Sequence, residues 1–303
     1  MVATDPGRRR PDGAVGSAPA TLPAPAPYHL ARTLSCGQAF GWRVDGTTAT
    51  GIFAGRPVRL RQQKDVITMQ GLDDEPSRLR LRRFLGVDEP LREIEGHLAG
   101  DAVLRRILPW TSGIAILRQD PWECLIGFIV SAFNNIPKIE LTLSRLRERF
   151  GEPGHNGVKT FPSAQALANA SLRELRACVL GYRTRYVREA ARLVARGAVD
   201  LNAPRSASYD DARRMLLAVP GVGGKVADCV LLFAYGKDEA FPVDVWVKRA
   251  VERWYFGGRA RSERRIREFA RERFGNLSGY AQQHLFYGIR EGSLEPMLKP
   301  IQR

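Results

Sequence analysis

The sequence predicts an α+β fold, in which a small antiparallel β domain precedes a larger all-helical domain. Two periodicities support this prediction. Between Tyr28 and Gly71, apolar residues alternate with polar ones, as in strands that bury one face. After Asp73, apolar residues recur every three or four positions, as on one face of a helix. Because the second pattern continues almost to the C-terminus, helices should account for most of the chain.

The β region contains two segments with clear alternation and one turn signal. Val58 and Leu60 alternate with polar neighbours, and Ile67 and Met69 do the same. The tripeptide Val-Asp-Gly at 44–46 is typical of a tight turn between strands. These features predict antiparallel strands joined by short turns.

The helical region begins near residue 79. The segment 122–133 is almost wholly apolar, which favours a helix buried in the core. Other helices with one apolar face are expected at 79–85, 91–98, 139–150, 164–170, 172–180, 186–195, 209–218, 225–235, 244–255, 263–274 and 280–289.

Composition divides the chain into three parts. Residues 1–27 contain three consecutive arginines and a Pro/Ala-rich run, which predicts a disordered basic tail. We expect a β-rich domain with helices at 28–115 and a helical domain at 116–303. The sequence shows neither a secretory signal nor an apolar stretch long enough to span a bilayer. We therefore expect a protein that is not secreted, located in a bacterial cytoplasm near the nucleoid or in a nucleus.

The charge balance indicates the kind of partner. Lys and Arg number 47 against 32 Asp and Glu, which gives a formal net charge of +15. Such a surplus favours a polyanion, with nucleic acid ahead of an anionic membrane surface. A generally basic proteome is the alternative explanation.

The cysteines argue against a metal or disulfide framework. Cys36, Cys124, Cys178 and Cys229 are far apart and form no Cys-x-x-Cys pair. This spacing does not indicate a zinc site and excludes a compact four-cysteine iron–sulfur loop. Free thiols in a reducing compartment are expected.

The segment 219–224, Val-Pro-Gly-Val-Gly-Gly, predicts a tight hairpin between two amphipathic helices. Glycine adopts positive φ angles at little cost, which suits such a turn. Glycines such as Gly221 and Gly223 leave their amide N–H groups uncovered, and the next helix adds its positive N-terminus. Together these groups can bind a backbone phosphate. An αα-hairpin without a ligand is the alternative.

Lys225 begins the second helix of this hairpin. Partial burial and the helix dipole both disfavour a charged ammonium group at that position. A neutral lysine is a nucleophile that can form a Schiff base. A further phosphate contact is the alternative role for this side chain.

Asp244 follows an apolar segment and precedes a helix, so it is a candidate N-cap. A carboxylate that faces a pocket can also stabilise positive charge at a sugar C1′ as a glycosidic bond breaks. The two roles are compatible.

Five separated motifs, in order, resemble the helix-hairpin-helix glycosylase superfamily. Within it they are similar to the eukaryotic-type 8-oxoguanine DNA glycosylase family. The motifs lie at 34–42, 117–124, 134–136, 180–186 and 281–286, beside the hairpin lysine and the downstream aspartate. The resemblance covers nearly the whole chain after the tail. It implies a β domain similar to TATA-binding protein, packed on a helix-hairpin-helix domain.

The resemblance also implies an activity. A bifunctional glycosylase and lyase would flip 8-oxoguanine, or a ring-opened purine, out of duplex DNA. Lys225 would attack C1′ and Asp244 would support the developing charge, followed by β-elimination. No cofactor would be required, although hairpin carbonyls near Gly221 could hold a monovalent cation. The protein would act as a monomer, with no membrane partner.

Four further residues would form the base pocket. The Gly37 carbonyl would accept a hydrogen bond from N7–H, which 8-oxoguanine has and guanine lacks; such a bond contributes about 1–3 kcal/mol. Cys229 and Phe286 would sandwich the flipped base, and Gln282 would bond its Watson–Crick edge. Cys229 also follows Lys225 by one helical turn, so both should face one pocket.

A third group would face the base opposite the lesion. Asn134 would line the gap in the stack, Tyr182 would wedge beside it, and Arg176 and Arg183 would contact the estranged cytosine. A solvated helix face is the alternative location for each arginine.

Three positions depart from the family pattern. Phe133 replaces an asparagine and Lys138 replaces an arginine on the opposite-base side, and Trp246 replaces a histidine that contacts phosphate. Phe133 could fill the gap by stacking, whereas a lysine loses bidentate geometry. The preferred opposite base is therefore left open. Two other functions are also left open: a monofunctional glycosylase for alkylated bases, and a non-enzymatic helix-hairpin-helix DNA-binding protein.

Overall fold

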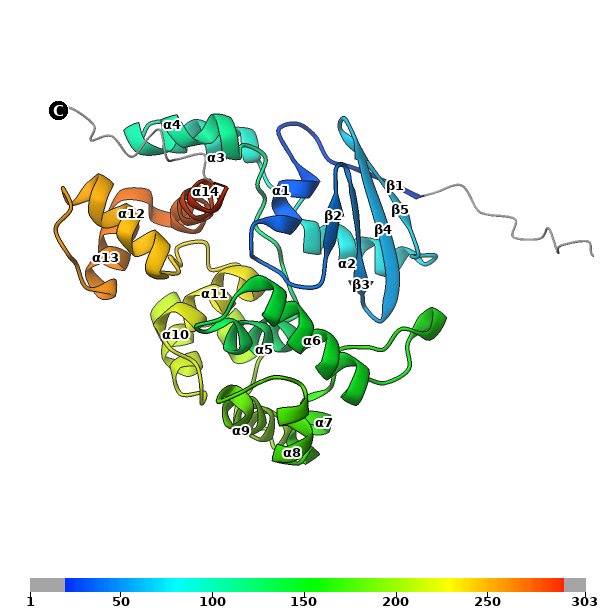
Figure 1. The fold of residues 1–303 in the computed structure, drawn as a ribbon. Helices are drawn as coiled ribbons and strands as arrows, with labels where there is room; N and C mark the ends of the chain where they lie inside the picture. Colours follow the sequence, from blue (N-terminus) through cyan, green and yellow to red (C-terminus); the bar gives the residue numbers. More distant parts are fainter. Residues whose placement is uncertain (1–19, 292–303) are drawn as a thin grey trace, which may run out of the picture.

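The computed structural model describes residues 20–291, which form one antiparallel sheet and a larger set of helices (Figure 1). The sheet has the order β1-β5-β4-β3-β2. Its strands are β1 (Ala20–Pro23), β2 (Arg43–Asp45), β3 (Thr48–Phe53), β4 (Arg56–Gln63) and β5 (Val66–Gln70). The expected α+β fold is confirmed, and so is the tight turn after Asp45, where Gly46 has a φ of 56°.

The prediction of a disordered tail at 1–27 is wrong for its last eight residues, 20–27. Residues 20–23 form the edge strand β1, in which Leu22 pairs with Ile67 of β5, and Leu22 and Ala24 are buried. An edge strand tolerates Pro23, because proline has no N–H to donate. The strand was not predicted because its pairing partner lies more than 40 residues away and its composition is that of a linker. The remainder of the expected tail, 1–19, lies outside the described residues.

Two helices attach the sheet to the rest of the molecule. Helix α1 (Leu30–Ser35) contacts β2 and β3, and helix α2 (Glu75–Leu85) packs through Phe84. The Phe84 ring lies 5.3 Å from Phe53 of β3 and 5.8 Å from Trp42, measured between ring centroids. One face of the sheet is thus covered, which explains the alternation of apolar residues along its strands.

All but one of the remaining helices match the expected segments; the exception is α4, which was not predicted. They are α3 (Leu91–Leu98), α4 (Ala102–Thr111), α5 (Pro121–Ser131), α6 (Ile136–Phe150), α7 (Ala164–Asn169), α8 (Leu172–Ala177), α9 (Arg183–Ala195), α10 (Tyr209–Leu217), α11 (Gly224–Tyr235), α12 (Val245–Tyr255), α13 (Glu263–Phe274) and α14 (Ser278–Arg290). Helix α5 is buried, as predicted, and packs against α11 at the centre of the helical part (Figure 1). No helix in residues 20–291 is long and apolar enough to cross a membrane.

The C-terminal helix α14 packs on α4, which precedes the expected domain boundary at residue 115 (Figure 1). The Oγ1 atom of Thr111 lies 2.8 Å from Nδ1 of His284 in this interface. Arg118 adds a second link, because it pairs with Asp238 at 2.9 Å and with Glu89 at 3.1 Å. These contacts therefore join the segment 89–118 to the segment 238–284.

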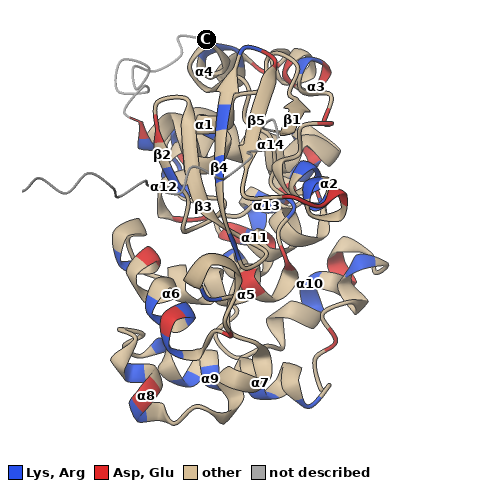
Figure 2. Cartoon of the chain, turned by 90° about the vertical axis from the view of Figure 1, so that its right-hand side faces the viewer, with Lys and Arg blue, Asp and Glu red and all other residues tan. Residues whose placement is uncertain are grey.

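Basic residues are distributed over the surface and do not form one block. In the cartoon of Figure 2, lysine and arginine positions are marked on α2, α6, α8 and α9, with acidic positions among them. The net charge of +15 thus acts over a broad surface. Such a distribution is suited to attraction over a distance and not to one tight anion site.

Candidate active site

A pocket forms where α5, α11, the start of α12, α14 and the loop after α1 meet. It is lined by Gly37, Phe128, Lys225, Cys229, Phe233, Pro242, Asp244, Gln282, Gln283 and Phe286. All the residues expected to act in chemistry or to bind the base are among them. These residues come from both ends of the chain, so only the folded protein brings them together.

Lys225 lies in the first turn of α11, after the N-cap residue Gly223, as expected. Its side chain is half-buried and lies over the ring of Phe128, with Nζ 4.9 Å from the ring centroid. Nζ also donates a hydrogen bond of 3.1 Å to Oγ of Ser131. Helix α5 therefore supplies both contacts that hold the amine at the pocket.

Asp244 is the N-cap of α12, as expected, and accepts a hydrogen bond of 2.7 Å from the amide of Val247. Burial raises the pKa of this carboxyl group, while the Val247 amide and the positive charge of Lys225 oppose the rise. The cap fixes one carboxylate oxygen, and the group lines the same pocket as the lysine. Capping and a role in the pocket are compatible here.

Gly37 lies close to Phe286 of α14. Its φ is 83°, and a Cβ atom at this position would lie 3.0 Å from Cε1 of Phe286. The neighbouring Gln38 is buried and holds the loop in place. Its Nε2 donates to the carbonyl of Ala115 at 2.8 Å, and its Oε1 accepts from the amide of Leu117 at 2.9 Å. The loop is thus pinned beside the Phe286 ring.

Cys229 and the two glutamines of α14 form the rest of the wall. Burial raises the pKa of the Cys229 thiol to about 12, so it is a neutral, weakly polar surface at physiological pH. All four cysteines are free and buried, which confirms the expectation of free thiols. The Oε1 atom of Gln282 accepts a hydrogen bond of 2.6 Å from Nε2 of Gln283, which orients the Gln282 amide.

Two aromatic side chains that line the pocket, Phe128 and Phe233, were not predicted from the sequence; together they form the aromatic floor of the pocket. Phe128 and Phe233 stack with ring centroids 5.4 Å apart, and Phe40 packs against Phe128 at 5.6 Å. One signal was present, because Phe233 follows Cys229 by one helical turn and shares its face. Phe128 carried no such signal, since every residue around it in α5 is also apolar.

The expected hairpin joins α10 to α11. Gly221 has a φ of 84°, and a Cβ there would lie 2.6 Å from Cβ of Tyr186, so the hairpin rests against α9. Gly223 differs from the expectation, because its φ is −94° and any residue could adopt it. Gly223 is exposed, with nothing within 4 Å of a built Cβ. A glycine at this position leaves open space above the N-terminus of α11.

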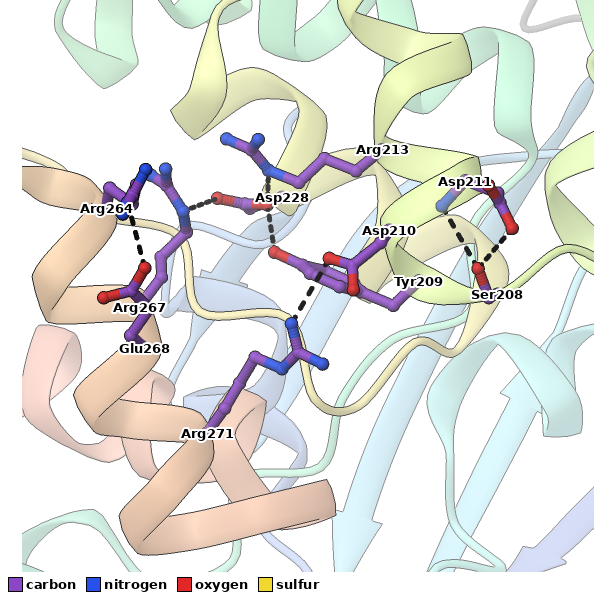
Figure 3. A network of polar contacts seen from close by, with 10 residues as sticks. All are labelled: Ser208, Tyr209, Asp210, Asp211, Arg213, Asp228, Arg264, Arg267, Glu268 and Arg271. Atoms are coloured by element: carbon purple, nitrogen blue, oxygen red, sulfur yellow. Dashed lines mark hydrogen bonds and ion pairs between the residues drawn. The ribbon is translucent and has the colours of Figure 1, made fainter.

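Asp228 lies on α11 away from the pocket and joins three helices (Figure 3). Its Oδ1 accepts hydrogen bonds from the Tyr209 hydroxyl at 2.7 Å and from Nε of Arg213 at 2.8 Å. Its Oδ2 lies 3.8 Å from Nε of Arg267 on α13. Burial raises the pKa of this carboxyl group, and the two guanidinium charges oppose the rise. The cluster fixes α11 relative to α10 and α13.

Two of the residues expected to face the opposite base are the arginines Arg183 and Arg176. Arg183 is buried, and its guanidinium donates to the carbonyls of Ala132 and Phe133, with Nε and Nη2 respectively at 2.9 Å. Two carbonyls inside the protein thus occupy Nε and Nη2 of Arg183, and its contact with the opposite base stays a prediction. Arg176 is exposed on α8.

The other members of this group surround the loop between α5 and α6. Tyr182 is 57% exposed, and its hydroxyl donates to the carbonyl of Ala132 at 3.2 Å. Nδ2 of Asn134 donates to the carbonyl of Val130 at 3.1 Å. Lys138 is exposed in the first turn of α6. These residues lie near one another, but their roles toward DNA stay predictions.

No group of three or more His, Cys, Asp or Glu side chains within 20–291 could hold a metal ion. The monovalent cation expected near Gly221 stays a prediction.

The fold and site define a class of protein. Residues 126–276 match the HhH-GPD superfamily of base excision DNA repair proteins. Residues 22–125 match the N-terminal domain of 8-oxoguanine DNA glycosylase. The chain therefore belongs to the 8-oxoguanine DNA glycosylase family within that superfamily.

Curated relatives and solved structures agree with this assignment. The chain is 32% identical to a probable N-glycosylase/DNA lyase of Methanothermobacter thermautotrophicus, over 80% of this chain and 85% of the relative. It is 31% identical to the N-glycosylase/DNA lyase of Saccharomyces cerevisiae, over 75% and 68%. The 8-oxoguanine glycosylase/lyase of Clostridium acetobutylicum, in complex with DNA containing cytosine opposite 8-oxoguanine, superposes with a TM-score of 0.83 at 32% identity, over 88% and 93%.

Proposed function

We propose that this chain excises 8-oxoguanine from duplex DNA and then cleaves the strand, as an N-glycosylase and DNA lyase. The observation that carries the proposal is the meeting of Lys225 and Asp244 with Gly37, Cys229 and Phe286 in one pocket. The relatives named above are N-glycosylase/DNA lyases, and the Clostridium acetobutylicum structure contains 8-oxoguanine. Both support the same activity and substrate here.

The chemistry follows from the pocket. A flipped base lies between the Cys229 thiol and the Phe286 ring, where the Gly37 carbonyl accepts its N7–H. Lys225 Nζ then attacks C1′, and the bond from C1′ to N9 breaks with its electron pair leaving on the base. Asp244 stabilises the positive charge at C1′.

The lysine nitrogen of this adduct loses a proton, and the sugar ring opens as the bond from C1′ to O4′ breaks, with O4′ leaving as a hydroxyl. The resulting Schiff base allows strand cleavage. Loss of a C2′ proton expels the 3′ phosphate by β-elimination, and water releases the lysine from the sugar. None of these steps needs a redox cofactor or a metal ion. A ring-opened purine that offers a donor at the N7 position fits the same pocket.

DNA binding rests on general contacts. The exposed amides at Gly223 and the N-terminus of α11 bind a backbone phosphate, and the net charge of +15 attracts the duplex. We propose that the protein acts as a monomer, in the compartment that holds the DNA, and that a monovalent cation can bind at the hairpin carbonyls.

Borohydride trapping tests the mechanism. The protein is incubated with a duplex that carries one 8-oxoguanine, and reduction should join it covalently to the DNA. Lys225→Gln should bind this duplex and give no adduct. Asp244→Asn keeps a capping side chain, so it should stay folded and lose about 10²–10³ in rate, as when one stabilising group is removed.

Base release without an adduct would contradict the lysine mechanism and indicate attack by water. Release of 3-methyladenine but not 8-oxoguanine would instead indicate a glycosylase for alkylated bases. DNA binding without release of either base would leave only a DNA-binding protein.

A further inference from the structure

A second cavity, with a volume of about 550 Å³, is lined by the β3–β4 turn, α2, the N-terminal half of α5, α6 and the loop between α6 and α7. Cavities that enclose a whole small molecule measure roughly 300–1,000 Å³. Phe128 lines both this cavity and the base pocket. Ser131, which bonds Lys225 Nζ, lies at the opposite end of the 11-residue helix α5, and such a helix is about 16 Å long. The second cavity is therefore a site apart from the nucleophile.

Hydrogen bonds between separate elements hold the walls of the second cavity. The amide of His155 donates to the carbonyl of Gly55 at 2.9 Å, which ties the loop between α6 and α7 to the β3–β4 turn. The indole Nε1 of Trp122 donates to the carbonyl of Pro162 at 2.8 Å, which ties the same loop to α5. The cavity is thus fixed on two sides by contacts between the sheet and the helices.

Aromatic rings form much of the interior of the second cavity. Trp42, Phe53, Phe84, Trp122 and Phe161 line it. The rings of Trp42 and Phe84 are stacked, with centroids 5.8 Å apart. Such rings bind a planar ligand through stacked or edge-to-face contacts. The interior is therefore suited to a flat, aromatic molecule.

Glu123 places a carboxylate among these rings. Burial raises the pKa of this carboxyl group, and the positive charge of Arg147 opposes the rise. Oε1 accepts a hydrogen bond of 2.9 Å from Nη2 of Arg147. Oε2 has no partner within residues 20–291, and 41% of the side chain stays accessible because it faces the cavity. One carboxylate oxygen is thus left to accept hydrogen bonds from a ligand.

Three exposed arginines that line the second cavity have no acidic partner. They are Arg80 and Arg83 on α2 and Arg205 in the short 3₁₀ turn before α10, and none forms an ion pair within the described part of the chain. The neighbouring Arg82 differs, because it pairs with Asp88 at 2.6 Å and does not line the cavity. Guanidinium groups without a counter-charge favour an anion, and a phosphate above all.

We propose that the second cavity binds a guanine nucleotide, with the base among the aromatic rings and the phosphate at the three arginines. Guanine carries two adjacent donors, N1–H and N2–H, on the edge that would face Glu123. Adenine carries an acceptor, N1, beside its amino group, so it would place a lone pair against the carboxylate. The nucleotide is bound reversibly and is not cleaved. The inference goes beyond the proposed function, because it concerns a different site and a different ligand.

Isothermal titration calorimetry of the full chain with GMP tests the inference. We expect saturable binding of one nucleotide per chain, with a Kd between about 10 μM and 1 mM. Guanosine should bind about tenfold more weakly, because it lacks the phosphate that the arginines bind. AMP should also bind at least about tenfold more weakly, because it lacks the two donors. Inorganic phosphate should give no saturable binding over the same range.

Variants on the two sides of the cavity locate the ligand. Glu123→Gln should raise the Kd of GMP about tenfold, because a neutral amide replaces the carboxylate acceptor. Arg83→Ala should raise the Kd of GMP by a similar factor and leave that of guanosine unchanged. Arg83 is exposed, so this variant should fold even if Glu123→Gln does not. Arg82→Ala is the matched control on the same helix and should leave both values unchanged.

Four results would overturn the inference. They are a Kd for GMP above about 1 mM, equal affinity for AMP and GMP, inorganic phosphate bound as tightly as GMP, and a Kd for GMP that neither Glu123→Gln nor Arg83→Ala changes. Lys225→Gln separates the inference from the proposed function, since it should bind GMP like the wild-type protein. Weaker binding by Lys225→Gln would place GMP in the base pocket and refute the second site. GMP binding that depends on Glu123 and Arg83, in a protein that gives no borohydride adduct, would leave this site standing without the proposed function.

Discussion

Gly37 is the residue that we propose reads the N7–H of 8-oxoguanine. Its positive φ is strained for any other residue, and a Cβ atom there would require the Phe286 ring to shift by a few tenths of an ångström. Its carbonyl belongs to a loop that the buried Gln38 holds in place. A contact that must distinguish 8-oxoguanine from guanine by a single hydrogen depends on such rigidity, because displacement of the acceptor weakens the bond.

Gly37→Ala should reduce excision more than it reduces stability. The new Cβ would lie 3.0 Å from the Phe286 ring, which narrows the space between Phe286 and Cys229. The positive φ should cost about 1 kcal/mol of unfolding free energy. We expect kcat/KM for 8-oxoguanine to fall at least about tenfold, which corresponds to about 1.4 kcal/mol of lost transition-state stabilisation.

Gly46→Ala provides the matched control for this change. Gly46 also has a positive φ, of 56°, but nothing lies within 4 Å of its built Cβ. It should therefore lose similar stability and keep full activity. Equal activity in both variants would show that the pocket tolerates a wider residue at Gly37.

Helix α11 has two functional faces. One face carries Lys225 and Cys229 into the pocket, and the other carries Asp228 into the cluster with Arg213 and Arg267 (Figure 3). The cluster fixes the helix on the side away from the pocket. The position of Lys225 thus depends on a buried ion cluster that does not touch the pocket.

Asp228→Asn should destabilise the protein strongly. The asparagine retains the shape of the side chain but leaves two largely buried guanidinium groups without their counter-charge, and breaking a buried ion pair in this way costs about 3–5 kcal/mol. Urea denaturation should show the loss. Retention of the wild-type unfolding free energy would mean that the cluster contributes nothing to stability.

Asp210→Asn tests the specificity of that effect. Asp210 pairs with Arg271 at 3.3 Å in the same region, but its side chain is 70% exposed. An exposed pair contributes about 0–1 kcal/mol, so the unfolding free energy should change little.

The whole molecule is held together where α14 meets α4. His284 is fully buried there, next to Thr111, and burial lowers the pKa of its imidazole from 6.5 to about 4. The folded state therefore favours the neutral ring. Since α14 also carries Gln282 and Phe286, the same helix closes the pocket and joins the two parts of the chain.

Stability should depend on pH through this histidine. A lowered folded-state pKa means that its contribution is fully present above pH 6.5 and is lost as the pH falls toward 4. The full loss corresponds to about 3 kcal/mol of unfolding free energy. Urea denaturation at pH 7 and at pH 4.5 should show this difference in wild type.

Two variants isolate the contribution of His284. His284→Gln cannot protonate, so its unfolding free energy should vary less over this pH range. His97→Gln removes an exposed histidine on α3 and should keep the wild-type dependence. An identical pH dependence in all three proteins would exclude His284 as its source.

Local patterns were sufficient for much of this protein. Most of the helices could be predicted because apolar residues recur along them every three or four positions, whereas α1 and α4 were not predicted. The hairpin could be predicted from its glycines, and Asp244 from the capping position. Lys225 and Cys229 could be placed together because one helical turn separates them. In each case the cause acts over a few residues, so the sequence alone determined the outcome.

Only the tertiary structure decided the rest. Strand β1, the burial of Arg183 under the loop at Phe133, the Asp228 cluster and the aromatic floor at Phe128 all depend on partners far away in the chain. Whether an arginine faces solvent or two carbonyls depends on which groups folding removes from water. That desolvation is a property of the packed molecule, and no local period or motif records it.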